Sequence, residues 1–178
     1  MKQRIFLALL ALALVPAAAR AGSVGIGVFG GISVPILYDG ATNGTQYGAR
    51  LPIGLLPFLT LEPYYAQSEL GDKDETFGGV TYTRSGPEVE SFGANALFNF
   101  GGPVRFYPYA GIGQTTIKQT GSDDVTDTSI NFGLGFGFTP VGSLSIDIRG
   151  ELNSIVTGDT SRKFGNLTAG VSYAFSTR

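Results

Sequence analysis

Residues 144–152, with the sequence LSIDIRGEL, alternate between apolar and polar side chains and decide the fold of this chain. Successive side chains of an extended strand point to opposite faces, so the leucines and isoleucines share one face. Ser145, Asp147 and Arg149 lie on the other face, together with Glu151. A helix would mix these two sets, because its side chains repeat about every 3.6 residues. The stretch is therefore expected to be a β-strand with one apolar and one charged face.

The same alternation recurs from residue 23 to residue 175. In residues 130–138, INFGLGFGF, one face again carries bulky apolar side chains, but the other holds Asn131 followed by three glycines. Eight runs are long enough to cross a bilayer, which takes about 9 to 11 residues of a tilted strand. They are expected at residues 23–36, 46–56, 59–68, 90–100, 104–114, 128–139, 143–154 and 165–175.

The connections between these runs alternate between short and long. Short turns are expected around Pro57, at 101–103 and at 140–142, and long polar loops at 37–45, 69–89, 115–127 and 155–164. Short turns on one rim and long loops on the other are typical of transmembrane barrels, whose long loops face the outside. Within the longest loop, Gly78-Gly79 separates β-prone residues and predicts a hairpin over residues 76–83.

The two-residue alternation does not show which face of the strands meets lipid. Two kinds of barrel, one soluble and one transmembrane, agree with this pattern. In a soluble barrel of the lipocalin type, the phenylalanines would fill the interior and the glycines would face water, where glycine weakens a strand. In a transmembrane barrel, the glycines face a lumen that is crowded when only eight strands surround it. The transmembrane assignment gives the glycines a role, which the soluble one does not. We therefore predict an all-β fold, an antiparallel up-and-down transmembrane β-barrel of eight strands.

Six charged side chains of the strands share the glycine face, and each would cost about 2 to 4 kcal/mol if it faced the middle of the hydrocarbon. These predicted structural lumen charges are Arg50, Glu62, Arg105, Asp147, Arg149 and Glu151. Their three positive and three negative charges balance, which favours a closed network of ion pairs over an open conduit. Aromatic candidates for the interfacial girdles are Tyr47, Tyr65, Phe106 and Tyr173.

The N-terminus has the three parts of a secretory signal. Lys2 and Arg4 precede an apolar run at residues 5–15, and Ala19-Arg20-Ala21 supplies a small-x-small cleavage site before Gly22. The apolar run is too short to span a bilayer. We expect a signal peptide at residues 1–21 and one barrel domain at residues 22–178.

The composition excludes several classes of function. The chain has no cysteine, which excludes disulfides and thiolate metal sites, and no histidine, which excludes histidine acid/base chemistry and histidine metal ligation. Without the signal peptide, nine basic and fourteen acidic residues remain, a net charge of −5. An acidic chain without basic clusters does not favour nucleic acid as a partner. No catalytic residue, cofactor-binding residue or metal ligand is predicted.

Two motifs resemble ligand sites without the context that such sites need. Residues 25–30 match the dinucleotide fingerprint G-x-G-x-x-G but lie inside an alternating run rather than between a strand and a helix. Acidic clusters at residues 72–75 and 123–127 offer the oxygen donors that Ca²⁺ prefers, without the spacing of a calcium loop. A glycine-lined strand and solvated acidic loops are the expected interpretations, and divalent-cation binding by the loops stays open.

Two segments carry a family resemblance. YPYAGIG at residues 107–113 leads into the middle of the barrel, and LTAGVSYAF at residues 167–175 forms its last strand. With eight strands, the chain resembles the small outer-membrane barrels of the OmpA and OmpX type over residues 22–178. The resemblance implies that the last strand, with its terminal aromatic, is read by the outer-membrane assembly machinery. Here the chain continues with Ser176-Thr177-Arg178, whereas that family usually ends on the aromatic.

The expected location is the bacterial outer membrane, with membrane lipids and lipopolysaccharide as partners. The leading hypothesis is a non-enzymatic barrel that contributes to envelope structure and displays surface loops. The alternatives are a narrow pore or transport route for small, even apolar, solutes, and an adhesin acting through residues 69–89. An enzyme acting on membrane lipid would need a base beside its nucleophile, usually histidine, which this chain lacks. The oligomeric state is left open.

Overall fold

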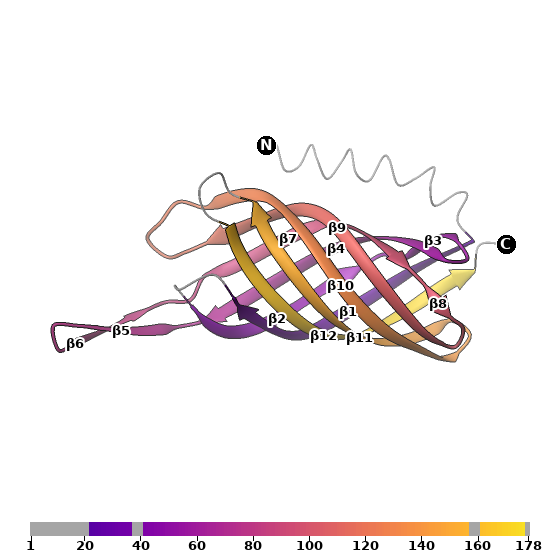
Figure 1. Ribbon diagram of the computed structural model, residues 1–178, viewed down its shortest axis with the longest axis horizontal. Helices are drawn as coiled ribbons and strands as arrows, with labels where there is room; N and C mark the ends of the chain where they lie inside the picture. Colours follow the sequence, from indigo (N-terminus) through magenta and orange to yellow (C-terminus); the bar gives the residue numbers. More distant parts are fainter. Residues whose placement is uncertain (1–21, 37–40, 157–160, 177–178) are drawn as a thin grey trace.

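The computed structural model describes residues 22–36, 41–156 and 161–176 and consists of antiparallel strands (Figure 1). The predicted signal peptide lies outside the described residues. Within them, no helix is long and apolar enough to cross a membrane. The strands are β1 (Ser23–Pro35), β2 (Thr42–Arg50), β3 (Ile53–Leu56), β4 (Leu59–Gly71), β5 (Lys73–Phe77), β6 (Val80–Arg84), β7 (Glu88–Phe98), β8 (Phe100–Gly101), β9 (Val104–Lys118), β10 (Val125–Val141), β11 (Leu144–Val156) and β12 (Ser161–Ser176).

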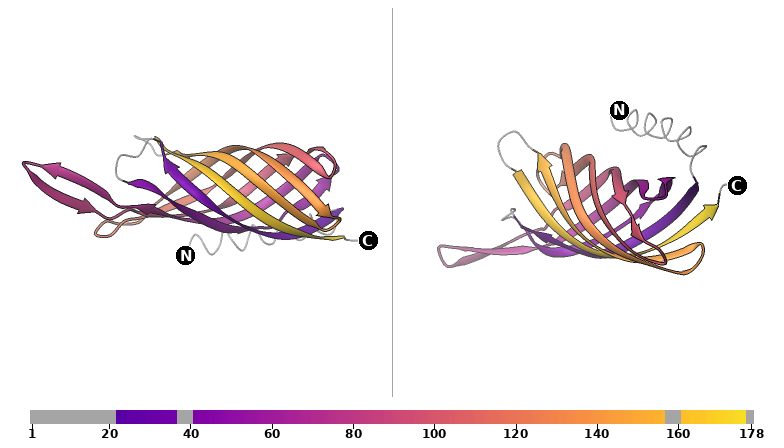
Figure 2. Two further views of the ribbon diagram at one scale, coloured as in Figure 1. Left: turned by 90° about the horizontal axis from the view of Figure 1, so that it is seen from below. Right: turned by 45° about the vertical axis from the view of Figure 1, so that its right-hand side comes forward.

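Ten of these strands form one closed sheet. The order β10-β11-β12-β1-β2-β4-β7-β9 is closed by pairing between β9 and β10. The short β3 continues β2, because both pair with β1 and β4, and β8 continues β7, because both pair with β9. The barrel wall is therefore eight strands around. Figure 2 shows the tilted strands enclosing a lumen. The predicted fold, an eight-stranded antiparallel up-and-down barrel, is confirmed.

Side chains of β10 show why one face of the barrel carries glycine. Phe132, Leu134, Phe136 and Phe138 point outward and are exposed, whereas the glycines between them point into the lumen. Tyr109, Tyr107 and Arg105 of the neighbouring β9 lie over these glycines. A Cβ atom built on Gly135 would lie 2.3 Å from the Tyr107 ring, and one on Gly133 would lie 2.2 Å from the Tyr109 ring. The glycines leave the space that these large side chains occupy.

The barrel walls extend further at the loop end than the sequence pattern predicts. The predicted strand at residues 59–68 continues to Gly71 in β4, and the one at 104–114 continues to Lys118 in β9. In these extensions the two faces exchange character, since Glu69 points outward while Leu70 is buried inside. The exchange has a physical reason, because beyond the hydrocarbon the outer face meets water.

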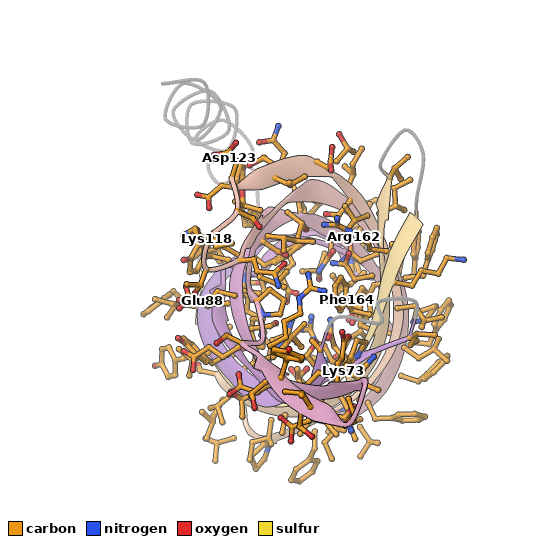
Figure 3. The ribbon with its side chains drawn as sticks, turned by 90° about the vertical axis from the view of Figure 1, so that its left-hand side faces the viewer. Lys73, Glu88, Lys118, Asp123, Arg162 and Phe164 are labelled. Carbon is orange, nitrogen blue, oxygen red and sulfur yellow. The ribbon has the colours of Figure 1, made fainter. Side chains whose placement is uncertain are left out.

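We call the outward polar residues at this level the collar. They are Glu69, Glu88, Glu90 and Lys118, and the pairing register sets Glu69, Glu88 and Lys118 side by side. In the end-on view of Figure 3, Glu88 and Lys118 lie at the rim and Phe164 lies within the ring. Tyr47 and Tyr65, two predicted girdle residues, are exposed just below the collar and donate hydrogen bonds to Glu69 and Glu90. An aromatic ring in lipid with its hydroxyl in a polar layer is the arrangement expected at a membrane interface.

A hairpin of β5 and β6 projects beyond the barrel at the loop end (Figures 1 and 2). Its two-residue turn is formed by Gly78 and Gly79, whose φ angles are 62° and 81°. Positive φ at both positions is the requirement of a type I′ turn, which glycine meets without strain. The hairpin predicted from Gly78-Gly79 is confirmed.

The glycine packing can be tested with two alanine substitutions. Gly135→Ala forces a methyl group against Tyr107 and should lower the free energy of unfolding by about 1 to 3 kcal/mol, the usual cost of overpacking. Gly150→Ala, on the outer face of β11, meets no atom within 4 Å and is the matched control. Urea unfolding of the detergent-folded protein, followed by heat-modifiable gel migration, measures both. Equal effects of the two substitutions would contradict the packing described.

Candidate functional site: the polar lumen

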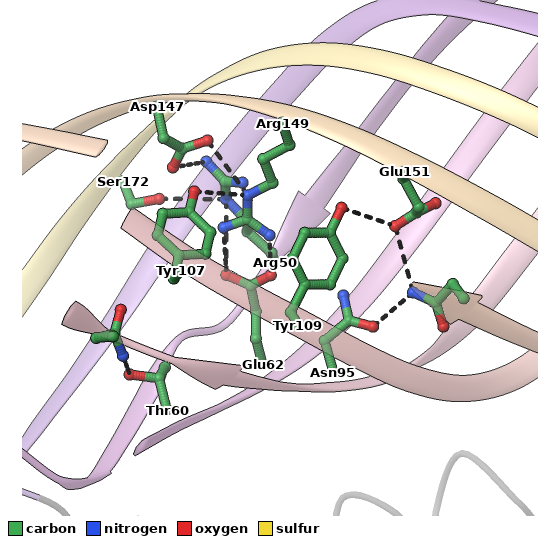
Figure 4. Close-up of polar contacts among 12 residues, drawn as sticks. Arg50, Thr60, Glu62, Asn95, Tyr107, Tyr109, Asp147, Arg149, Glu151 and Ser172 are labelled. Atoms are coloured by element: carbon green, nitrogen blue, oxygen red, sulfur yellow. Dashed lines mark hydrogen bonds and ion pairs between the residues drawn. The ribbon is translucent and has the colours of Figure 1, made fainter. Parts of the chain in front are cut away.

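Four buried charges form a network in the middle of the lumen (Figure 4). Arg50 comes from β2, Glu62 from β4, and Asp147 and Arg149 from β11, with exposed fractions of 2%, 1%, 3% and 7%. Arg50 Nη2 lies 2.7 Å from Asp147 Oδ2. Arg149 holds Glu62 with both terminal nitrogens, and Nη2 lies 2.9 Å from Oε2. The network therefore connects three strands, β2, β4 and β11, across the lumen.

Neutral groups complete the hydrogen bonding of the two arginines. Arg149 Nε donates to Tyr107 Oη at 3.0 Å and to Asp147 Oδ1 at 3.3 Å, and Arg50 Nε donates to Ser172 Oγ at 3.3 Å. The Arg149 guanidinium also lies over the rings of Tyr107 and Tyr109. Buried ion pairs offset their desolvation cost only with such additional partners. The two tyrosines were not among the residues predicted for the site.

The other two predicted lumen charges lie inside the barrel but form no ion pair in the described part of the chain. Glu151 accepts hydrogen bonds from Tyr109, Asn131 and Asn166 at 3.1 to 3.2 Å. Arg105 donates to Ser145 Oγ at 2.6 Å. The six charges thus divide into four that pair and two that lie on either side of the network.

The loop end of the lumen is filled by apolar side chains, which we call the apolar plug. Its members are Ala41, Leu70, Val89, Ile117, Ile155 and Phe164. Between the plug and the charges lies a layer of hydroxyl and amide groups, in which Thr115 Oγ1 bonds to Ser91 Oγ at 2.9 Å and to Ser129 Oγ at 3.0 Å. The plug was missed because the alternation pattern placed its residues in loops. Those of its residues that belong to strands lie at the alternate positions that face the lumen, not at those that face the membrane. This alternation could have identified them.

The short-turn end of the lumen is hollow. A cavity of about 490 Å³ opens there, and its lining includes Glu62, Asp147 and Arg149 of the network. On the far side of the network, the lumen cavities found among the described residues are only about 30 and 10 Å³. Volumes of that order hold about one water molecule. We call the large cavity the vestibule.

The acidic loop clusters do not converge on a cation site in the structure. No group of three or more Asp, Glu, His or Cys side chains within the described ranges is placed to hold a metal ion. Asp72 instead accepts a hydrogen bond from the backbone N–H of Gly86, and Asp74 accepts one from the Thr83 hydroxyl. The fingerprint at residues 25–30 lies within β1, as a glycine-lined strand.

Comparison with known proteins agrees with this architecture. The model of the outer membrane protein beta-barrel domain family matches residues 5–175. The chain belongs to this family. No curated protein sequence matches it.

Solved structures share the fold at low sequence identity. Neisserial surface protein A is 18% identical with a TM-score of 0.68, and the match covers 87% of this chain and 98% of that one. The N-terminal barrel domain of Pseudomonas aeruginosa OprF is 17% identical with a TM-score of 0.62 and the same coverage. Pseudomonas aeruginosa OprG is 16% identical with a TM-score of 0.53, covering 89% of this chain and 98% of that one. The predicted resemblance to small outer-membrane barrels is confirmed.

The network can be tested by removing one of its charges. Glu62→Gln leaves two buried arginines facing only Asp147, so the free energy of unfolding should fall by about 3 to 5 kcal/mol. Glu69→Gln, on the exposed collar, removes a charge of the same sign and should cost less than about 1 kcal/mol. Urea unfolding of both variants gives the comparison. A Glu62→Gln protein as stable as Glu69→Gln would mean that the network contributes nothing to stability.

Proposed function

We propose that the protein is a non-enzymatic, sealed barrel of the outer membrane that contributes to envelope structure and displays surface loops. The observation that carries this proposal is the double closure of the lumen, by the charge network in the middle and by the apolar plug at the loop end. An ion crossing the barrel would have to separate buried ion pairs and then wet a cluster whose members are at most 8% exposed. Each step is costly in a low-dielectric interior.

The location and partners of the protein are part of the proposal. Residues 1–21 are proposed to act as a cleaved signal peptide. The assembly machinery is proposed to read β12, with Phe175 near its end. The exposed apolar band would contact membrane lipid, and the collar would lie among lipopolysaccharide head groups. The acidic composition supports no nucleic-acid partner.

The surroundings of two buried serines support a non-enzymatic role. Ser172 is bound to Arg50 Nε and Ser145 to Arg105 Nη2, so each is held by a cation rather than by a base. Activation of a serine needs a neighbouring group that takes its proton. The chain has no histidine for this task.

Binding through the β5–β6 hairpin is a second candidate function. The hairpin extends away from the barrel, and its Tyr82 is 61% exposed. Deleting residues 73–84 tests binding by the hairpin alone, because the deletion keeps Leu70 and Val89 in the apolar plug. A deletion of all of residues 69–89 would disturb the barrel as well.

A sealed lumen predicts that the protein does not conduct ions. In planar-bilayer recording, the folded protein should show no discrete conductance steps under conditions in which an open porin does. Phe164→Ala, which thins the apolar plug, should also stay silent, because the charge network still closes the lumen. Reproducible steps from the unaltered protein would refute the sealed barrel and favour the pore hypothesis.

A further inference from the structure

The vestibule contains a cation that lacks a counter-ion. Arg105 projects from β9 into this cavity, and within the described residues no carboxylate lies within 4.0 Å of its guanidinium. Its hydrogen bond from Nη2 to Ser145 Oγ involves a neutral hydroxyl. Its Nε is buried without a hydrogen-bond partner. Its guanidinium also lies over the Tyr107 ring, 5.9 Å from the centroid, which supplies no full negative charge. A partly buried arginine with these partners favours a negative charge nearby.

The other charges around the vestibule do not supply that negative charge. Glu62 and Asp147 line its inner end, but both are engaged by Arg50 and Arg149, two negative charges against two positive ones. Glu151, the remaining acid among the six predicted lumen charges, lines the small cavity on the other side of the network. Along β11 it is four residues beyond Asp147, which corresponds to about 13 Å. Among the described side chains of the network and the vestibule lining, the positive charges therefore exceed the negative ones by one.

The rest of the vestibule wall suits a hydroxylated molecule. Its lining includes the polar side chains of Thr60, Asn99, Thr139, Ser143 and Ser145. These are donors and acceptors of hydrogen bonds without charge. The volume of about 490 Å³ is within the usual range of small-molecule sites, about 300 to 1,000 Å³. The opening lies at the short-turn end, which faces the periplasm in barrels of this kind.

From this geometry we infer that the vestibule is a binding site for a small hydroxylated oxyanion. Arg105 binds the oxyanion, a carboxylate or a phosphate, and the hydroxyl and amide groups of the wall bind the rest of the molecule. The network closes the inner end, so the ligand enters and leaves by the periplasmic opening. The site adds a binding function to a barrel that is otherwise proposed to be structural.

Isothermal titration of the folded full-length chain in detergent tests this site. The probes are gluconate, inorganic phosphate and the uncharged polyol sorbitol. Gluconate should bind more tightly than phosphate if the wall recognises hydroxyls, and sorbitol should bind much more weakly than either. Phosphate binding equal to gluconate would restrict the site to the oxyanion and overturn the role of the wall. Absence of gluconate and phosphate binding, or equal binding of sorbitol, would overturn the site.

Three substitutions assign the binding to Arg105. Arg105→Gln should weaken gluconate binding by about tenfold or more, the usual effect of losing a charged hydrogen bond. Arg84→Gln, on the hairpin at the opposite end, removes the same charge and should leave binding unchanged. Ser145→Glu places a carboxylate of the chain beside Arg105 and should abolish binding. Heat-modifiable migration verifies that each variant is folded.

The substitutions also keep the inference falsifiable if one of them fails to fold. Ser145→Glu keeps Arg105 and gives it a carboxylate in place of a hydroxyl, so the folded variant decides the question without Arg105→Gln. Gluconate binding that survives in folded Ser145→Glu would overturn the site. Equal loss of binding in Arg84→Gln would show a general charge effect and overturn it too.

Discussion

The solvent on the outer face of each strand changes along its length, and the rest of the structure depends on this change. In the hydrocarbon layer, apolar side chains must point outward and charges inward. Above that layer, the outer face meets water and the same alternation continues with the faces exchanged. Ile112 of β9 is exposed to lipid, whereas Ile117, five residues further on, is buried in the plug. A single strand thus directs apolar side chains outward at the level of the hydrocarbon and inward at the level above it.

The lumen is stabilised by matching large and small residues across neighbouring strands. Glycines of β10 admit Tyr107 and Tyr109 of β9, and these rings support the guanidinium of Arg149. A side chain in place of one of these glycines would clash with a tyrosine ring, and loss of Glu62 would leave Arg149 with Asp147 as its remaining ion-pair partner. The closed lumen, the stability of the barrel and the proposed absence of conduction therefore have the same origin.

Much of the fold could be predicted from the sequence because period two is a local property. The strand pattern, the glycine face and the Gly78-Gly79 hairpin all follow from nearest neighbours. Most of the predicted strands are too short at the loop end, as in β4, where the predicted strand ends at Ser68 and the observed one at Gly71. The reason is that a pattern with apolar residues outside ends where the two faces exchange character. Which charges pair could not be predicted, because Arg50 and Asp147 are 97 residues apart and meet only across the lumen. The apolar plug depends on the same closure.

The exchange of faces can be measured directly on β9, because the chain has no cysteine and an introduced cysteine is therefore the single labelling site. Spin labels at Ile112→Cys, Ile117→Cys and Lys118→Cys report collisions with oxygen, which enters lipid, and with a water-soluble nickel chelate. We expect oxygen contact at position 112, nickel contact at position 118, and protection from both at position 117. Oxygen contact continuing to position 118, or free nickel access at position 117, would contradict the exchange of faces.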